Sequence, residues 1–221
     1  MIALVVAPHP DDDILGCGGV MACHAANGDS VHVVVVTRGA SDMRPAELVE
    51  QNRRQLQEAH GVLGVTEARF LDFPAAKLDT VPGHEVADGI GRCIREIQPS
   101  VVYLPHGGDI HADHQAVYLA TLVAARPING CSVKKLLTYE TLSETEWGSP
   151  RAESAFIPTV FVDVGKYLET KLDAMSRMSM QLKEAPHPRS LQGIESLARL
   201  RGATVGFSAA EAFSLVREVI E

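Results

Sequence analysis

Two short polar stretches in this sequence combine histidine and aspartate at spacings that suit a metal site. The first, His9-Pro10-Asp11-Asp12-Asp13, directly follows the apolar run 2–7, and the second, His111-Ala112-Asp113-His114, comes shortly after the apolar run 101–104. Two imidazoles and one carboxylate suit a catalytic divalent metal such as zinc, which keeps a coordination position open for water. The remaining acids and imidazole would lie beside that metal for proton transfer. The two stretches therefore predict metal-assisted hydrolysis.

Each stretch also has a purely structural interpretation. Asp11 and Asp12 are common residue types at the start of a helix, where they cap it and interact with its dipole. His111 and His114 are compatible with surface imidazoles at a polar helix start. Two neighbouring carboxylates repel each other, however, and a cation bound to one of them removes the conflict. Because both stretches follow buried strands of one predicted sheet, we favour a shared metal site.

The elements that would position these residues alternate between strand and helix. Continuous apolar runs predict strands, and apolar residues at helical spacing predict helices; the expected strands are 2–7, 31–36, 68–71 and 101–104, and the expected helices are 15–26, 45–63 and 86–97. This alternation predicts the α/β class, with a Rossmann-like layered α/β/α fold and a mostly parallel sheet. Ligands of such sheets bind at the carboxyl ends of the strands, where both polar stretches fall. The two stretches would meet if their strands are neighbours.

The second half of the chain has a different pattern. We expect strands over 135–139 and 159–164, a polar loop over the site at 140–158, and three helices, 166–182, 191–200 and 208–220. Ser208 and Glu211 have the spacing of a capping box at the start of the last helix. We expect a single domain over 1–221, in which residues 1–125 form the core with the metal site and residues 126–221 add strands and helices.

Three glycines follow the first polar stretch. The spacing of Gly16, Gly18 and Gly19 is G-x-G-G, which differs from the G-x-G-x-x-G fingerprint of dinucleotide-binding proteins. We therefore interpret them as residues that let the first helix pack closely on the sheet.

The composition and net charge of the chain limit the kinds of molecule that the protein would bind. The 221 residues carry a net charge of −8, which disfavours nucleic acid and anionic membranes as partners. No apolar stretch has the roughly 20 residues that span a bilayer. The chain enters its first strand without a basic segment, and its four cysteines have no CxxC spacing, so we expect a cytoplasmic protein with reduced thiols. The C-terminal apolar segments suit either a homo-oligomer or completion of the core.

The two polar stretches also carry a family resemblance. Ala7-Pro8-His9-Pro10-Asp11-Asp12 with its glycine-rich continuation, together with His111-x-Asp113-His114, resembles the PIG-L (LmbE-like) family of metal-dependent N-deacetylases. The likeness covers residues 1–125 and includes Thr37-Arg38-Gly39 and Leu63-Gly64-Val65. Residues further along resemble a bacterial branch of the family more loosely; they are Tyr139-Glu140, Glu146-Trp147 and Pro186-His187-Pro188-Arg189-Ser190.

The resemblance implies roles for individual residues and a substrate. His9, Asp12 and His114 would bind one Zn²⁺ per chain, and Asp11 would be the general base. His111 would stabilise the oxyanion or protonate the leaving amine, and Asp113 would orient His111 or His114. The substrate would be an N-acetylated sugar, such as an N-acetylglucosamine-type glycoconjugate, or a related amide.

Some positions depart from the family pattern, and others are candidates for contacts with the substrate. Pro8 precedes the histidine where the family usually has a small residue, Asp13 stands where Glu is usual, and Gln55 lies near a position that is often Glu. The nearby Arg53 and Arg54 are candidates for holding a substrate hydroxyl. Further candidate substrate contacts are Asp109, Tyr139 and Trp147, each with an ordinary structural role as the alternative.

Two other functions fit parts of the sequence. Two histidines and a carboxylate also suit Fe(II) oxygenases, although these usually have β-barrel folds, and a free base at Asp11 favours hydrolysis. A non-catalytic Rossmann-like module, either receiver-like or nucleotide-binding, would account for acids after the first strand. It would not account for His111 and His114.

Overall fold

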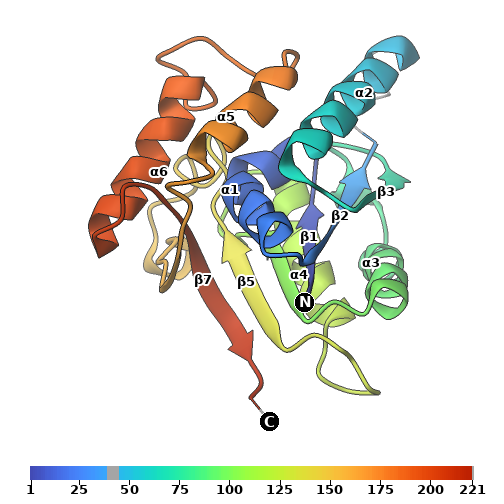
Figure 1. The fold of residues 1–221 in the computed structure, drawn as a ribbon. Helices are drawn as coiled ribbons and strands as arrows, with labels where there is room; N and C mark the ends of the chain where they lie inside the picture. Colours follow the sequence, from blue (N-terminus) through green and yellow to red (C-terminus); the bar gives the residue numbers. More distant parts are fainter. Residues whose placement is uncertain (39–44, 221) are drawn as a thin grey trace.

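The structure is a computed structural model that describes residues 1–38 and 45–220. In these residues one sheet of seven strands lies between two layers of helices (Figure 1). The strands are β1 (Ile2–Ala7), β2 (Ser30–Thr37), β3 (Glu67–Phe73), β4 (Val101–Pro105), β5 (Lys135–Tyr139), β6 (Val160–Asp163) and β7 (Ala210–Glu218). The helices are α1 (Asp12–Ala26), α2 (Ala46–Leu63), α3 (Gly83–Ile97), α4 (Ala112–Ala124), α5 (Leu168–Arg177) and α6 (Leu191–Val205), with short 3-10 helices η1 (Leu78–Thr80) and η2 (Ala152–Ser154). Gly39, which belongs to a stretch that carries the family resemblance, lies outside the described residues.

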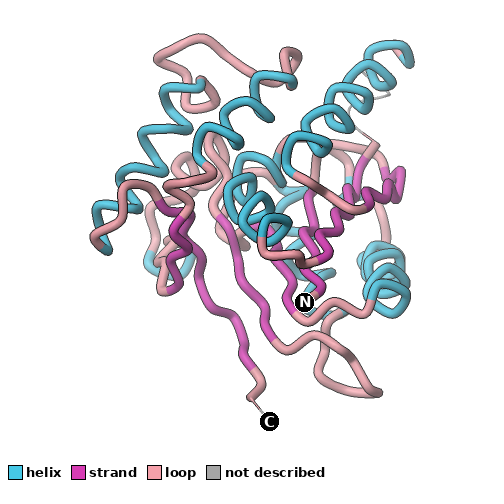
Figure 2. The backbone as a smooth tube through the Cα atoms, viewed as in Figure 1, coloured by secondary structure: helices cyan, strands magenta, loops and turns pink. Residues whose placement is uncertain are grey.

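The sheet confirms the α/β class predicted from the alternating elements. Its strand order is β3-β2-β1-β4-β5-β7-β6. Figure 2 shows the strands in magenta, with the cyan helices around them. The five strands β1 to β5 are parallel, and β7 is antiparallel to both β5 and β6. The sheet is therefore mostly parallel, with one antiparallel strand inserted near an edge.

The central strands are continuous apolar runs because an apolar cluster covers each face of the sheet. Ala3 and Val5 of β1 belong to the cluster formed with α1, α2 and α5, whereas Leu4 and Val6 belong to the cluster formed with α3 and α4. Successive side chains of a strand point to opposite faces, so a strand covered on both faces must be apolar throughout. This central strand leads directly into the first polar stretch.

The last predicted helix is wrong, because residues 210–218 form strand β7. The strand is inserted between β5 and β6, and it buries Phe213 against Tyr103 with ring centroids 5.0 Å apart. Glu211 does not complete a capping box. Its carboxylate accepts hydrogen bonds from the backbone of Gly19 and Val20 in α1. Packing within the sheet thus overrides a local pattern that fits a helix.

The other C-terminal elements lie close to their predicted positions. Strands β5 and β6 match the two expected strands, α5 is shorter than the predicted helix 166–182, and α6 is longer than the predicted helix 191–200. Since β5, β7 and β6 extend the sheet built by the first half, we propose that the whole chain is one domain. Across residues 1–38 and 45–220, no helix has the length and apolarity needed to cross a bilayer.

The three glycines allow the close packing predicted for them. A Cβ atom at Gly16 would lie 2.2 Å from the ring of Tyr139, and one at Gly19 would lie 2.8 Å from the side chain of Val164. These distances are too short for any other residue without movement. Helix α1 therefore lies directly on the sheet, which fixes the position of its N-terminus.

Candidate metal centre

The order of the strands brings the two polar stretches together. Strands β1 and β4 are hydrogen-bonded neighbours and run in the same direction, so the loops that follow them emerge at the same edge of the sheet. The first loop carries His9 and leads into α1, and the second leads into α4 with His114 in its first turn. The condition set by the sequence, that these strands be neighbours, is met.

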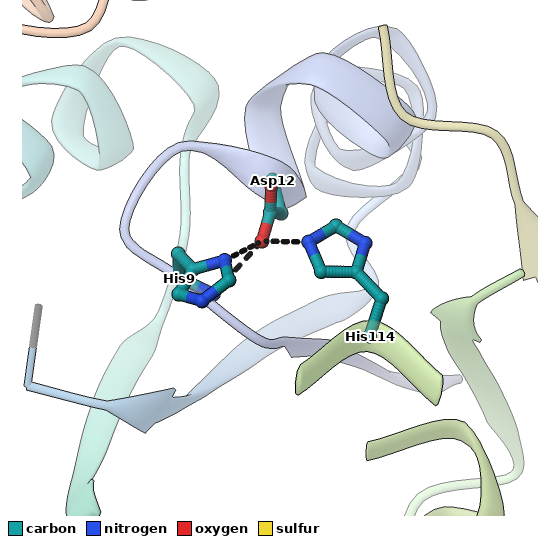
Figure 3. A group of neighbouring side chains, drawn as sticks. All are labelled: His9, Asp12 and His114. Carbon is teal, nitrogen blue, oxygen red and sulfur yellow. Dashed lines mark hydrogen bonds and ion pairs between the residues drawn. The ribbon is translucent and has the colours of Figure 1, made fainter. Parts of the chain in front are cut away.

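Three side chains converge at this edge (Figure 3). Asp12 Oδ2 lies 3.2 Å from His9 Nδ1 and 3.2 Å from His114 Nε2. One ligand atom from each residue lies within 4.8 Å of the other two. Two imidazole nitrogens and a carboxylate oxygen in such a group match a catalytic zinc site with an open position.

The state of His114 supports a metal at this point. Its Nε2 atom is buried and lies 3.2 Å from Asp12 Oδ2 without the geometry of a hydrogen bond. Its other ring nitrogen, Nδ1, lies 2.8 Å from Asp109 Oδ2, so a neutral ring that donates there presents the Nε2 lone pair on the side of Asp12, where a cation would bind. The residues therefore fit a divalent cation.

Asp109 has a different position from the one expected of a substrate contact. Its side chain is fully buried, and its carboxylate accepts from His114 and from the Thr145 hydroxyl at 2.6 Å. It therefore orients the imidazole of His114, as carboxylates commonly do behind histidines that bind a metal. The loop after β4 places Asp109 behind His114, away from the cavity.

Asp113 also has another partner than expected. Its Oδ2 atom accepts from His9 Nε2 at 2.9 Å, and its carboxylate is fixed further by the backbone N–H groups of Ala76 and Leu78. The expectation was that Asp113 would orient His111 or His114. The first turn of α4 instead points this carboxylate at the loop after β1, so that Nδ1 of His9 is left for the metal.

These charged groups shift one another's pKa values. Burial disfavours the charged form of His9, but its hydrogen bonds with Asp113 and Asp12 outweigh burial and raise its pKa to about 9. Burial has the same effect on His114, and the charge of Asp12 with the hydrogen bond to Asp109 raises its pKa to about 10. Burial would raise the pKa of Asp12, yet His114 and His9 lower it below its usual range. The cluster thus keeps Asp12 as a carboxylate.

Asp11 stands beside the metal group without joining it. Its φ angle is 143°, a conformation that residues with a side chain rarely adopt, and its side chain does not cap α1. Burial and the charge of Asp12 raise its pKa to about 8, against the lowering effect of Arg189, whose Nη1 lies 3.3 Å from Asp11 Oδ2. Strained backbone and a raised carboxyl pKa are both frequent in catalytic residues.

His111 lies next to the cluster as a neutral imidazole. Its ring centroid is 4.6 Å from that of His9, and burial with the charges of His9 and His114 lowers its pKa. Its Nδ1 atom accepts from the backbone N–H of Asp113 at 3.1 Å, so the neutral ring carries its proton on Nε2. His111 is therefore a hydrogen-bond donor.

A cavity of about 270 Å³ opens onto these groups. His9, Asp11, Asp12 and His111 line it, so the predicted catalytic residues share one space. Its other walls contain polar residues that the sequence did not single out; they are Asn52, Glu144, Gln181 and Arg189. Glu144 belongs to the polar loop that the sequence predicts over the site at 140–158, and Arg189 belongs to a segment that resembles the family.

Like Asp109, the other four candidate substrate contacts do not line this cavity. Arg53 pairs with Asp72 and stacks on Phe70, and Arg54 is exposed to solvent. Tyr139 is fully buried, because its hydroxyl donates to the backbone of β1 at 2.9 Å and its ring covers Gly16. Trp147 is 52% exposed outside the cavity.

Asp13 and Gln55, which differ from the family pattern, each contact a residue of another segment. Asp13 Oδ2 lies 2.6 Å from His60 Nε2 of α2, so the shorter acid reaches a buried partner without water. Gln55 donates to Ser179 at 2.7 Å, away from the cavity. These residues connect α2 with α1 and with the segment after α5.

The model of the GlcNAc-PI de-N-acetylase (PIG-L) family matches residues 4–125, which include both polar stretches. The chain belongs to this family. This PIG-L family member is 29% identical over 180 residues to the uncharacterized deacetylase YaiS of Escherichia coli K12, a match that covers 79% of this chain and 88% of that protein. It is 33% identical over 157 residues to a 1D-myo-inositol 2-acetamido-2-deoxy-alpha-D-glucopyranoside deacetylase of Kineococcus radiotolerans, covering 55% of this chain and 44% of the relative. The chain thus spans less than half the length of the second relative.

Solved structures share the fold over nearly the whole chain. The conserved protein TT1542 from Thermus thermophilus has a TM-score of 0.80 and 27% identity, covering 99% of this chain and 96% of that one. The 4-carboxy-2-hydroxymuconate hydratase GalB from Pseudomonas putida KT2440 has a TM-score of 0.78 and 20% identity, covering 100% and 98%. Because a hydratase has this fold, the reaction must be argued from the site.

Proposed function

We propose that this PIG-L family member is a zinc-dependent N-deacetylase that hydrolyses the acetamide of an N-acetylated sugar, of the N-acetylglucosamine type, or of a related amide. The observation that carries the proposal is the convergence of His9, Asp12 and His114 next to Asp11, at the wall of one cavity. The deacetylase relatives support the same reaction. A cytoplasmic location remains a prediction from the sequence.

His9, Asp12 and His114 would hold the zinc. Bound zinc would polarise the amide carbonyl and lower the pKa of a water molecule to about 7. With zinc bound, the hydrogen bonds to Asp109 and Asp113 would hold the two neutral imidazoles in the tautomers whose other ring nitrogens can bind the metal. The protein's contribution to this stage is a preorganised set of ligands.

Asp11 and His111 would move the protons. Asp11 takes a proton from the attacking water as the oxygen bonds to the carbonyl carbon. His111 Nε2–H donates to the oxygen on which negative charge develops. A proton delivered to the nitrogen by Asp11 or His111 then lets the C–N bond break, which releases acetate and an amine.

A screen for amine release tests this function. Purified protein is incubated with a panel of N-acetyl sugars after chelation, and again after addition of zinc or Fe(II). We expect amine release that chelation abolishes and zinc restores, whereas activity that survives the chelator would contradict the mechanism. Metal analysis of protein purified without added metal separates a zinc hydrolase from an iron enzyme.

A pair of histidine variants provides the matched control. His114→Ala removes a proposed ligand, and His84→Ala removes an exposed imidazole on α3. We expect the first variant to lose both zinc and amine release and the second to keep both.

A further inference from the structure

Two segments from the second half of the chain form the rim of the active-site cavity. One is the loop 141–148, which contributes Glu144, and the other is the segment 183–190, which contributes Arg189. They meet where the rings of Trp147 and His187 lie 6.0 Å apart. The following inference about substrate selection by this rim rests on the proposed deacetylase function.

The backbone of the second segment holds Arg189 in a defined place. Its N–H donates to His187 Nδ1 at 3.1 Å, and its carbonyl oxygen accepts from the backbone of Lys183 at 3.2 Å. The next residue, Ser190, is buried and caps α6 by accepting from the N–H of Gly193 at 3.0 Å. Arg189 is thus fixed on both sides.

The guanidinium of Arg189 is only partly used by the protein. Within residues 1–38 and 45–220, its one hydrogen bond, from Nη1 to Asp11 Oδ2, is 3.3 Å long, whereas charge-assisted pairs are usually about 2.7–2.9 Å. Its Nε atom is buried and has no hydrogen-bond partner among the described residues. The guanidinium therefore keeps hydrogen-bond capacity beyond its contact with Asp11, and the Arg189 side chain, which is 25% exposed, lines the cavity where a ligand can reach it.

The charges around the cavity favour an acidic ligand at this position. Arg38 is a second arginine on the cavity wall, in a protein whose net charge is −8. The acidic residues that line the same cavity are Asp11, Asp12 and Glu144. A divalent cation bound by Asp12 would offset two of these three negative charges, so an acidic ligand at Arg189 would meet little remaining repulsion. Guanidinium groups bind carboxylates and phosphates with two parallel hydrogen bonds.

We propose that Arg189 binds a carboxylate or phosphate on the substrate, so that the preferred substrates are N-acetyl amino sugars that carry an acidic substituent. Arg189 would then select the substrate at the same cavity wall where it contacts Asp11.

Calorimetry with the deacetylated products tests this binding without turnover. Zinc-loaded protein is titrated with glucosamine, glucosamine 6-phosphate, muramic acid and inorganic phosphate. We expect at least one acidic sugar to bind about 10- to 100-fold more tightly than glucosamine, since hydrogen bonds to charged groups contribute about 1.5–3 kcal/mol. Arg189→Gln should abolish that difference, and Arg199→Gln, which removes an exposed arginine of α6, should preserve it.

The arginine variant also separates two origins of tight binding. A phosphate or carboxylate held only by the zinc would bind equally well to Arg189→Gln, and this result would overturn the proposal. Inorganic phosphate that binds as tightly as the sugar phosphate, with the same dependence on Arg189, would reduce the site to a general anion site and also overturn it.

Steady-state kinetics provide a second test of the role of Arg189. The ratio of kcat/KM for N-acetylglucosamine 6-phosphate or N-acetylmuramic acid to that for N-acetylglucosamine should exceed about 10 and fall toward 1 in Arg189→Gln. Arg189→Lys should recover part of the ratio. An equal loss on acidic and neutral substrates would mean that Arg189 only positions Asp11. If no N-acetyl sugar is cleaved, the proposed function fails, and calorimetry still decides the role of Arg189.

Discussion

Each proposed metal-binding imidazole is held by a carboxylate of its own. Asp113 accepts from one ring nitrogen of His9, and Asp109 accepts from one ring nitrogen of His114. A ring that donates through one nitrogen presents the lone pair of the other, so these acids determine which atom can bind the metal. The two carboxylates should therefore affect metal affinity although neither belongs to the proposed ligand set.

Substitution of the carboxylate behind His114 should weaken zinc binding. Asp109→Asn keeps the size of the side chain but removes the charge that orients the ring, and such changes typically cost 10–100-fold in metal affinity, about 1.4–2.7 kcal/mol. Competition with a chromophoric chelator measures the dissociation constant. Asp79→Asn, which changes an exposed acid of η1, is the control and should leave the affinity unchanged. Equal affinities for Asp109→Asn and the parent protein would contradict this role.

Removal of the proposed base should separate metal binding from turnover. Asp11→Asn leaves His9, Asp12 and His114 in place but cannot accept a proton, so we expect normal zinc content and a loss of about 10²–10⁴-fold in kcat. Metal analysis and initial rates of amine release measure the two properties on one sample. Full activity in this variant would reject Asp11 as the base.

Zinc affinity should rise with pH. The pKa values of His9 and His114, about 9 and about 10, are raised above the ordinary imidazole value, so both rings are protonated at neutral pH without a metal. A metal requires neutral imidazoles, and its binding must release these protons. Affinity should therefore increase as pH is raised from about 6.5 toward 9. Titrations in buffers of different ionisation enthalpy give the number of protons released; none released at pH 7 would contradict the prediction.

At the level of elements, the site depends on how α1 is anchored. Lys171 of α5 donates to the carbonyl of Leu15 at 2.7 Å and to Glu211 at 2.6 Å. Glu211 in turn accepts from the backbone of Gly19 and Val20. This buried ion pair connects α5 and β7 to the middle of the helix whose first residue is Asp12. A strand at the end of the chain thereby fixes the first polar stretch.

Breaking this ion pair should destabilise the fold. Glu211→Ala leaves the ammonium group of Lys171 buried without its counter-charge, a change that typically costs about 3–5 kcal/mol in the free energy of unfolding. Glu218→Ala on the same strand removes a partly exposed partner of Lys135 and should cost less than about 1 kcal/mol. Urea denaturation compares the two variants. Similar midpoints for both would show that the buried pair does not anchor α1.

For the whole molecule, the proposed metal joins segments that are distant along the chain. His9 and Asp12 follow β1, His114 follows β4, and the rim of the cavity comes from the second half of the chain. The unfolded chain does not bring these ligands together. Metal binding should therefore favour the native state as a whole.

Zinc should raise the melting temperature of the protein. A ligand that binds only the native state stabilises it by about 2.7 kcal/mol at one hundred times its dissociation constant. Calorimetric or fluorescence melting with and without zinc measures the shift, and His114→Ala should show little of it. A shift of equal size in His114→Ala would place the stabilising metal elsewhere.

The sequence alone predicted the α/β class and the strands whose ends carry the two polar stretches. These predictions succeeded because buried parallel strands must be apolar throughout, and because the site lies where two such runs end. The capping pattern at Ser208 and Glu211 failed, since the same residues form β7 when a sheet partner is available on each side. Local spacing does not contain that information.

Only the tertiary structure decided which side chains face the cavity and which acid serves which imidazole. Arg53 and Tyr139 had residue types that suit a sugar, yet one pairs with Asp72 and the other packs on Gly16. Arg189 reaches Asp11 from 178 positions away along the chain. The spacing of residues along a strand or helix determines which functional groups lie near its end. Contacts between distant segments depend instead on how whole elements pack.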